Sequence, residues 1–468
     1  MKKRIILIIS FPFLLLSAIA VKSQAAKSQP PSLQDLQQSF VNLRFGMFIH
    51  FNIPTFMNQD WSDPEASPLI FNPSNVDCDQ WAKAALSANM SYGCLTTKHH
   101  SGFCIWNTKT TDYSVMNSPV KKDIVKEFTN AFRAAGLHVM LYYSILDTHH
   151  RLRPNCITPA HIKMVKDQIT ELLTNYGKIE ALIIDGWDAP WSRISYTDIP
   201  FDEIYKLVKT LQPQCLLMDL NGAKYPAQGM FYTDIKTYEM GAGQRVSKEN
   251  NRMPALACLP INNNWFWKTN FPQTPIKDVE KLVTETLIPL NDANCNFILN
   301  VAPNNNGLID DNALAGLKHI GEIWKNKGPV GKLPQLQRPL KTRNLALKQP
   351  ANSSWSDDMN IMDFANDDDF STEWISNQTV ASPWYEIDFK KEEAFNTIAL
   401  TEKDPNIKKY RLIYFKDGVW VPLLSGNIES SVKIHRFKKI KTNKLKIFID
   451  QSAHQASIAE LGVYNEAD

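Results

Sequence analysis

The chain has 468 residues, with 51 lysines and arginines against 48 aspartates and glutamates and a formal net charge of +3 at pH 7. This length exceeds one ordinary domain and suits a catalytic barrel of roughly 250 residues or more with a smaller module. Hydrophobic residues make up 44% of the chain, enough for a sizeable core. The near balance of charge argues against nucleic acid as a partner.

The N-terminus carries the pattern of a secretory signal peptide. Residues 1–4 are basic, and residues 5–21 are apolar with small residues at their end. We assign residues 1–25 to this peptide and expect an exported protein, periplasmic or secreted, that has no membrane attachment after cleavage. A lone membrane anchor is the alternative. Residues 27–40 are polar and are expected to form a leader into the first strand.

Eight short apolar runs follow, and most of them end in a polar or aromatic residue. An unbroken apolar run is typical of a strand that is buried on both faces. The runs cover residues 45–50, 93–100, 138–143, 181–185, 215–219, 230–239, 256–259 and 296–300. Amphipathic helical stretches separate them at residues 78–89, 122–135, 158–176, 201–211, 275–290 and 310–325. This alternation predicts an α/β fold, a (β/α)₈ TIM barrel over residues 27–327.

The pattern of apolar and turn-forming residues changes after the predicted barrel. Residues 328–343 are punctuated by Pro and Gly and are predicted to be a linker. Short, often alternating runs then occur at residues 384–389, 397–401, 410–415, 420–424, 431–435 and 445–449. This pattern predicts an antiparallel β-sandwich over residues 344–468. The seven cysteines are an odd number, and several lie in strand-like runs, so we expect no disulfide framework. A single disulfide pair is the alternative.

Two acidic residues follow predicted barrel strands, at the end where barrel active sites gather. Asp185 ends an apolar run and precedes Gly186. It could instead be a turn residue that caps the next helix. If Asp185 takes part in glycoside hydrolysis, the reaction needs a second carboxyl group beside it. Glu239 is the preferred candidate for this second group, ahead of Glu249 and Asp234. An exposed loop glutamate is the alternative for Glu239.

Histidines and tryptophans also gather near strand ends. The histidines are His50, His99, His100, His149 and His150. Metal ligation is one interpretation, but adjacent histidines in a strand point to opposite faces. Hydrogen bonding to sugar hydroxyls is favoured, because aromatic faces that can stack on sugar rings accompany them. These aromatic residues are Trp61, Trp106, Trp187, Trp265 and Trp267.

Several motifs together resemble the α-L-fucosidase family of retaining glycoside hydrolases, over roughly residues 40–327. They include Arg44-Phe-Gly-Met-Phe-Ile-His50, Thr97-Lys-His-His-Ser-Gly-Phe-Cys-Ile-Trp106, Ile183-Ile-Asp-Gly186 and Asn300-Val-Ala-Pro303. The resemblance implies a (β/α)₈ catalytic domain that removes terminal α-L-fucosyl residues with net retention and without a catalytic metal or cofactor.

The resemblance also implies roles for single residues. Asp185 would be the nucleophile and Glu239 the acid/base. The predicted substrate-binding residues are His50, Asp60, Trp61, His99, His100, Tyr142 and Trp265. Departures from the family pattern are Asp60 in place of Glu, Ile183 in place of Trp, Leu256 in place of Glu, and the lack of an arginine near residues 219–222.

The C-terminal part resembles discoidin, or coagulation-factor type C, modules. The residues are Ala365-Asn-Asp-Asp368, Ser371-Thr-Glu-Trp374 and Trp384-Tyr-Glu-Ile-Asp-Phe389. In such modules a loop acidic cluster often holds a structural calcium, and residues 367–369 would suit this hard cation. An exposed acidic turn is the alternative.

The sequence therefore predicts an exported, exo-acting retaining α-L-fucosidase whose partner is a fucosylated glycan or glycoconjugate. A related α-L-galactosidase, a non-catalytic sugar-binding protein on the same scaffold and a metal-dependent barrel hydrolase are the alternatives.

Overall fold

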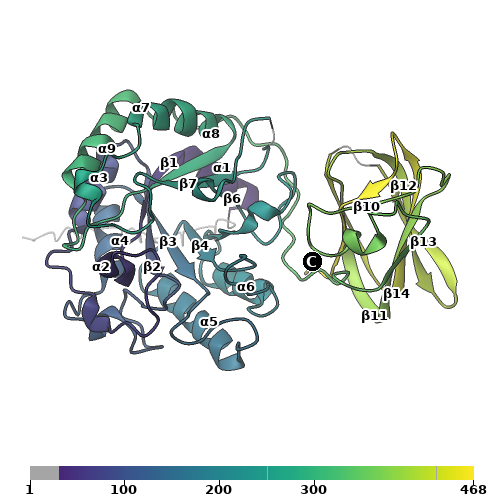
Figure 1. Ribbon diagram of the computed structural model, residues 1–468, viewed down its shortest axis with the longest axis horizontal. Coiled ribbons are helices and arrows are strands. Elements are labelled where there is room, and N and C mark those ends of the chain that lie inside the picture. The colour runs from purple at the N-terminus through teal and green to yellow at the C-terminus, as the bar shows by residue number, and fades with distance from the viewer. Residues whose placement is uncertain (1–30, 250, 428–429, 468) are drawn as a thin grey trace, which may run out of the picture.

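The computed structural model describes residues 31–249, 251–427 and 430–467, which form two domains side by side (Figure 1). The predicted signal peptide, residues 1–25, lies outside these ranges. Within the described ranges, no helix has the length and apolar character needed to cross a membrane.

The first domain is built on parallel strands that surround a common axis. Within the described part of the chain, eight of them form one sheet in the order β5-β4-β3-β2-β1-β8-β7-β6. They are β1 (Phe45–Ile49), β2 (Tyr92–Lys98), β3 (His138–Ser144), β4 (Ala181–Asp185), β5 (Leu216–Asp219), β6 (Lys236–Glu239), β7 (Ala255–Pro260) and β8 (Cys295–Asn300). Almost every residue in these strands is buried. The TIM-like barrel prediction is confirmed.

Strands β5 and β6 close the barrel mainly through side chains, not through a regular ladder. The backbone N–H of Leu217 donates to the Asp234 carboxylate at 2.9 Å, and the N–H of Asp234 donates back to the Leu217 carbonyl at 2.8 Å. The prediction of a strand over 230–239 was therefore too long, because Asp234 belongs to this closure and β6 begins only at Lys236.

Helices surround the barrel at the six predicted positions. The α-helices are α1 (Leu33–Leu43), α2 (Ile53–Met57), α3 (Cys78–Ser87), α4 (Ile124–Ala134), α5 (Pro159–Thr174), α6 (Phe201–Leu211), α7 (Val279–Lys281), α8 (Ile288–Asp292) and α9 (Asp311–Ile323). A π-helical segment, Leu282–Leu287, joins α7 to α8. Short 3₁₀ turns occur at Pro68–Ile70, Val115–Asn117, Gly222–Lys224, Met240–Ala242, Phe271–Gln273 and Met362–Ala365.

Helix α1 closes the amino end of the barrel. Its Phe40 and Val41 are each 2% exposed and belong to the apolar core that fills the barrel interior, and the ring of Phe40 packs 6.2 Å from that of Tyr92. The polar leader predicted for residues 27–40 was thus partly wrong. Ser32 and Asp35 form a capping box that starts a helix there.

The second domain is an antiparallel β-sheet domain. Its strands are β9 (Ala351–Ser353), β10 (Trp374–Ile375), β11 (Trp384–Thr401), β12 (Ile407–Lys416), β13 (Val419–Gly426), β14 (Val432–Ser452), β15 (Ser457–Ile458) and β16 (Glu460–Tyr464). The main sheet runs β13-β12-β14-β11-β16, and β10 pairs with β15 in a small second sheet. Trp374 and Tyr385 meet in the core between them, with ring centroids 5.6 Å apart.

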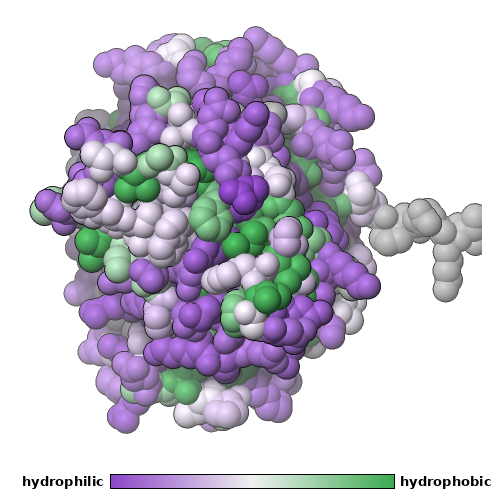
Figure 2. All heavy atoms as spheres, turned by 90° about the vertical axis from the view of Figure 1, so that its right-hand side faces the viewer, coloured by the Kyte–Doolittle hydropathy of each residue, from purple (hydrophilic) through white to green (hydrophobic). Residues whose placement is uncertain are grey.

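Two pairs of predicted short strands are single long strands. Residues 384–389 and 397–401 both lie in β11, and 431–435 and 445–449 both lie largely in β14. The pairing of β11 with β14 shifts register twice, so bulges let these long strands bend around the core. The end of the molecule that this domain forms is covered mainly by hydrophilic residues, with a smaller apolar area near its middle (Figure 2).

The linker and the second domain pack firmly on the barrel. In the predicted linker, residues 328–343, the N–H of Leu333 donates to Gln38 of α1 at 2.8 Å, and Leu340 exchanges backbone hydrogen bonds with the segment before β6. Val432 and Tyr464 of the second domain join the apolar core that surrounds the barrel. All seven cysteines fall in the described ranges and are free, and only Cys156 is exposed.

Candidate active site

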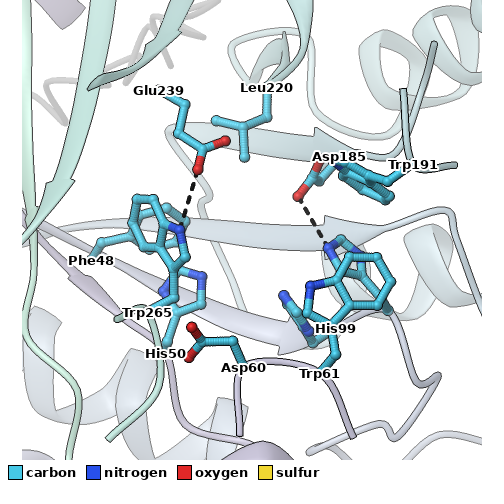
Figure 3. Close-up of a pocket in the computed structure, with 11 residues that line it drawn as sticks. Phe48, His50, Asp60, Trp61, His99, Asp185, Trp191, Leu220, Glu239 and Trp265 are labelled. Carbon is cyan, nitrogen blue, oxygen red and sulfur yellow. Dashed lines mark hydrogen bonds and ion pairs between the residues drawn. The ribbon is translucent and has the colours of Figure 1, made fainter. Parts of the chain in front are cut away.

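A pocket opens at the carboxyl end of the barrel strands and contains about 560 Å³ of space that is continuous with solvent (Figure 3). It is lined by Phe48, His50, Asp60, Trp61, His99, His100, Asp185, Trp191, Leu220, Glu239 and Trp265. Both predicted catalytic acids are among these residues. Of the seven predicted substrate-binding residues, six line the pocket, and the seventh, Tyr142, contacts Asp185.

Asp185 is the last residue of β4 and is 6% exposed. Gly186 then takes φ +101°, a conformation that favours glycine and turns the chain sharply away. The Tyr142 hydroxyl donates to one oxygen of Asp185 at 2.6 Å, and the Asn221 amide donates to the other at 2.8 Å. Asp185 caps no helix, since the next one, α6, begins at Phe201.

Opposing effects act on the charge of Asp185. Burial is the larger effect and raises its pKa above the usual value, while the hydrogen bonds from Tyr142, Asn221 and the Gly186 N–H act to lower it. All three groups donate to the carboxylate, so they favour its ionised form over the protonated form. The surroundings thus hold a buried carboxylate in one orientation.

Glu239 ends β6 and projects into the pocket from another side than Asp185 (Figure 3). Burial and the charge of Asp185 raise the pKa of Glu239 to about 7, although the Trp265 indole N–H, which donates to it at 3.2 Å, opposes this. Among the described residues, three donors contact Asp185 and this one contacts Glu239. A proton is therefore better held by Glu239 than by Asp185.

Asp60 is a third carboxylate at the pocket. The Lys268 ammonium lies 3.0 Å from it, and the Asn264 amide and the Phe266 N–H donate to it at 3.0 and 3.2 Å. Every one of these neighbours is a donor. Asp60 is therefore suited to accept hydrogen bonds.

His50 and His100 each present an acceptor nitrogen to the pocket. The side-chain NH₂ of Asn300 donates to a backbone carbonyl at 2.7 Å, which identifies the other side-chain atom of Asn300 as the oxygen. This oxygen accepts from Nδ1 of His50 at 2.7 Å. The Ser144 hydroxyl donates to a carbonyl at 2.9 Å and so accepts from Nδ1 of His100, at 2.8 Å. In both neutral rings, Nε2 is then the free acceptor.

Burial keeps these rings neutral. It is the main cause that lowers the pKa of His50 to about 4 and that of His100 to about 3. Nε2 of His100 lies 3.8 Å from Asp185, but a neutral imidazole forms no ion pair across that distance. Hydrogen bonding, not charge, is what these histidines offer.

His99 and His100 both reach the pocket, with ring centroids 3.9 Å apart. The expectation that adjacent histidines point to opposite faces does not apply, because β2 ends at Lys98 and both rings lie on the turn beyond it. Burial lowers the pKa of His99 well below its usual value. Among the described residues, its buried Nδ1 finds no hydrogen-bond partner.

Other candidates lie elsewhere. His149 stacks on Tyr113 at 3.9 Å, and His150 bonds to Asp147, so both hold loops together. Trp106 and Trp187 are fully buried in the core, and Trp267 packs in a separate small cluster with Phe271. None of these residues lines the pocket. The expectation that Trp106, Trp187 and Trp267 stack on sugar is wrong, because their rings are buried elsewhere.

The alternative second acids are also outside the pocket. Asp234 is buried in the closure of the barrel, where the Lys209 ammonium lies 2.8 Å away. Glu249 is exposed on the loop after β6. Leu256 and Ile183, two of the departures from the family pattern, are buried in the apolar interior of the barrel.

Four residues of the site were not predicted. Trp191, Leu220 and Phe48 line the pocket, Phe48 with only 1% exposure, and the Asn221 amide donates to Asp185. Leu220 and Asn221 directly follow β5, so their place after a barrel strand was an available signal. Trp191 comes from a longer loop after β4, whose direction the sequence pattern does not give.

The acidic loop of the second domain has its carboxylates engaged in other contacts. Asp367 accepts from the Asp369 N–H and the Thr372 hydroxyl, and Asp368 lies 2.8 Å from the Lys224 ammonium of the barrel. No grouping of three or more His, Cys, Asp or Glu side chains suited to a metal occurs in the described ranges. These residues, as arranged, do not fit a carboxylate cage, and calcium here stays a prediction.

Two carboxyl groups in a hollow at the carboxyl end of a (β/α)₈ barrel define a glycoside hydrolase type of site. The family model of α-L-fucosidases matches residues 64–329, more than half of the chain. Alpha-L-fucosidase 1 of Arabidopsis thaliana is 27% identical over 493 residues, which cover 97% of this chain and 92% of that protein. Plasma alpha-L-fucosidase of Homo sapiens is 23% identical over 329 residues, covering 62% and 68%. The chain belongs to the α-L-fucosidase family and is a glycosidase.

Solved structures share the fold. Alpha-L-fucosidase isoenzyme 1 from Paenibacillus thiaminolyticus matches with a TM-score of 0.52 at 22% identity, over 93% of this chain and 100% of that one. A mutant glycoside hydrolase family 29 fucosidase of Ruminococcus gnavus, solved in complex with fucose, matches with a TM-score of 0.51 at 21% identity, over 92% and 94%. Residues 349–461 match the F5/8 type C domain, so the discoidin-like module is confirmed.

Proposed function

We propose that the protein is an exo-acting retaining α-L-fucosidase, in which Asp185 attacks the anomeric carbon and Glu239 serves as acid and then as base. The observation that carries this proposal is the contrast between the two carboxyl groups of one pocket. Asp185 is surrounded by donors, while the pKa of Glu239 is raised to about 7. Such a contrast separates the nucleophile from the proton donor.

The reaction would proceed in two displacements. The Asp185 carboxylate forms a bond to the anomeric carbon as the bond to the leaving oxygen breaks, and Glu239 gives its proton to that oxygen. Glu239, now ionised, then takes a proton from water as the water oxygen displaces Asp185. The pKa of about 7 suits both steps near neutral pH.

The remaining lining suits a 6-deoxy sugar. His50 and His100 offer acceptors, and the unpartnered Nδ1 of His99 is a further polar group for sugar hydroxyls. Phe48 and Leu220 give the pocket an apolar part, where a methyl group would need no hydrogen-bond partner. This lining favours L-fucose over L-galactose, which carries an added hydroxyl.

The alternatives make different predictions. Sugar binding without catalysis does not require one acid with a raised pKa beside a second acid. A metal-dependent hydrolase requires a cluster of metal-ligating side chains. We propose further that the enzyme is exported and reaches fucosylated glycans outside the cytoplasm, on the basis of the N-terminal pattern in residues 1–25.

The test is a panel of aryl glycosides of L-fucose, L-galactose and D-galactose, with the product anomer followed by NMR from the first turnovers. We expect the fastest hydrolysis for the α-L-fucoside and release of the α anomer first. Initial release of the β anomer would contradict the retaining mechanism. No turnover of any substrate would favour the binding protein, and activity lost to a chelator and restored by zinc would favour the metal enzyme.

A further inference from the structure

A second hollow adjoins the catalytic pocket and shares a wall with it. Trp61 and Trp191 line both hollows and meet edge to face, with ring centroids 5.3 Å apart. They are 46% and 42% exposed, so each presents aromatic surface to solvent. The second hollow contains about 1010 Å³ of space open to solvent, which is room for further sugar units of a glycan.

The charge in this second hollow has one sign. Arg153 and Arg193 are its charged lining residues, and it has no aspartate or glutamate among the described residues that line it. Within the described ranges, an arginine within 4 Å of a carboxylate is found only at Arg411 and Asp450, on the other domain. Arg153 and Arg193 therefore line the hollow with no carboxylate of the described residues within 4 Å of either guanidinium group.

Both arginines are held on hydrogen-bonded loops. Arg193 takes φ +54°, an uncommon conformation for a side-chain-bearing residue, and its N–H donates to the Ala189 carbonyl at 2.8 Å. Arg153 follows a short bridge between Asp147 and Leu152, and its carbonyl accepts from the Cys156 N–H at 3.1 Å. Backbone hydrogen bonds thus fix where each side chain leaves the surface.

We propose that this hollow binds an acidic saccharide unit, carrying a carboxylate or a sulfate, of the same glycan whose fucosyl residue enters the catalytic pocket. Guanidinium groups bind both oxyanions through paired N–H donors. Trp61 and Trp191 supply faces for stacking on a sugar ring, and Ser62 and Thr148 add hydroxyls to the lining. This inference rests on the proposed function and names the substrate class for it.

The test compares three fucosylated oligosaccharides that differ only in the unit next to the fucosylated sugar, which is neutral, carboxylated or sulfated. We expect kcat/KM of the full-length protein to be about tenfold higher for at least one acidic substrate at low salt, because exposed charged contacts are worth little more. Added salt should reduce the preference, since it screens exposed charges.

Variants then assign the preference to the two arginines. Arg153→Gln with Arg193→Gln should bring the acidic substrates down to the neutral one and leave turnover of the neutral substrate and of a simple aryl α-L-fucoside unchanged. Arg151→Gln is the matched control, because it is exposed on the same loop but does not line the hollow. It should keep the preference.

Four results would overturn the inference. Equal kcat/KM on all three oligosaccharides would contradict it, as would an acidic preference that survives in the double variant. A double variant that loses neutral and acidic turnover equally would show a structural role for the arginines instead. Failure to hydrolyse even the aryl α-L-fucoside would refute the proposed function, and this inference with it.

Discussion

The two ends of the barrel place the same strands in opposite surroundings. At the amino end, α1 covers the strands with Phe40 and Val41, and the interior is apolar. At the carboxyl end, the strands finish in Asp185 and Glu239, beside neutral histidines. Burial raises the pKa of both acids at this open end, and the donors there set them apart.

The carboxyl end carries the chemistry and the amino end contributes stability, so changes at the two ends should have separable effects. The largest effect is expected at Asp185. Asp185→Asn removes the nucleophile, and kcat/KM on an aryl α-L-fucoside should fall by at least about a thousandfold while the fold is retained. Circular dichroism checks the fold. Asp167→Asn, on the solvent-facing side of α5 away from the pocket, is the control and should keep full activity.

Glu239→Gln should have the next largest effect. Loss of a general acid typically costs about 10²- to 10⁴-fold, and the loss should be greatest on substrates whose leaving groups need a proton. Glu249→Gln, on the same loop but exposed, should change little. An equal loss on good and poor leaving groups would contradict the role of Glu239 as the acid.

The pH profile of the unmodified enzyme should reflect the same residue. Glu239 must be protonated at the start of the reaction, and burial and the charge of Asp185 raise its pKa to about 7. Activity is therefore expected to fall as the pH rises through about 7. In Glu239→Gln this alkaline limb should disappear from kcat/KM, whereas an unchanged limb would assign it to another group.

Tyr142→Phe should give a smaller effect with a defined sign. Tyr142 donates to the Asp185 carboxylate, so its removal raises the pKa of Asp185, and the acid limb of the profile moves to higher pH. A hydrogen bond to a charged group is worth about 1.5–3 kcal/mol, so kcat/KM should fall about ten- to a hundredfold. Tyr143→Phe is the control, because that hydroxyl faces Lys98 and Gln168 outside the pocket. An acid limb that stays in place in Tyr142→Phe would contradict this role.

The smallest effect on turnover is expected at the closed end. Phe40→Ala removes a buried ring from the barrel interior and should lower the free energy of unfolding by about 3–5 kcal/mol. Activity per folded molecule should change less than about twofold. Chemical denaturation measures the free energy of unfolding. Leu69→Ala is the control, because Leu69 is 65% exposed. A large loss of kcat in folded Phe40→Ala would show that the two ends are coupled.

Much of the fold followed from pattern. The buried parallel strands could be predicted from unbroken apolar runs, because both of their faces are covered. The sequence pattern did not predict helix α1, because its few apolar residues lie among polar ones. Ser32 and Asp35, which form the capping box, were an available signal for the start of this helix. The length of β11 and β14 was missed because a bulge breaks the alternation of a strand without ending it.

The site was predictable where its residues end strands. Asp185 and Glu239 point into the barrel mouth because the parallel strands fix their direction. Trp191 and Arg193 lie on a loop whose course depends on its own hydrogen bonds, and no periodicity encodes that. The prediction that adjacent histidines point to opposite faces holds only within a strand. Because β2 ends at Lys98, one residue before this pair of histidines, the prediction did not apply to them.

The proposed retaining mechanism depends most on a covalent bond between Asp185 and the sugar. Incubation of the unmodified enzyme with a 2-fluorinated α-L-fucosyl donor that has a good leaving group should slow the second displacement and trap the intermediate. Mass spectrometry should then find one fluorofucosyl group per chain, and peptide mapping should place it on Asp185. A label on any other residue, or rapid turnover of other α-L-fucosides with no label at all, would contradict the account.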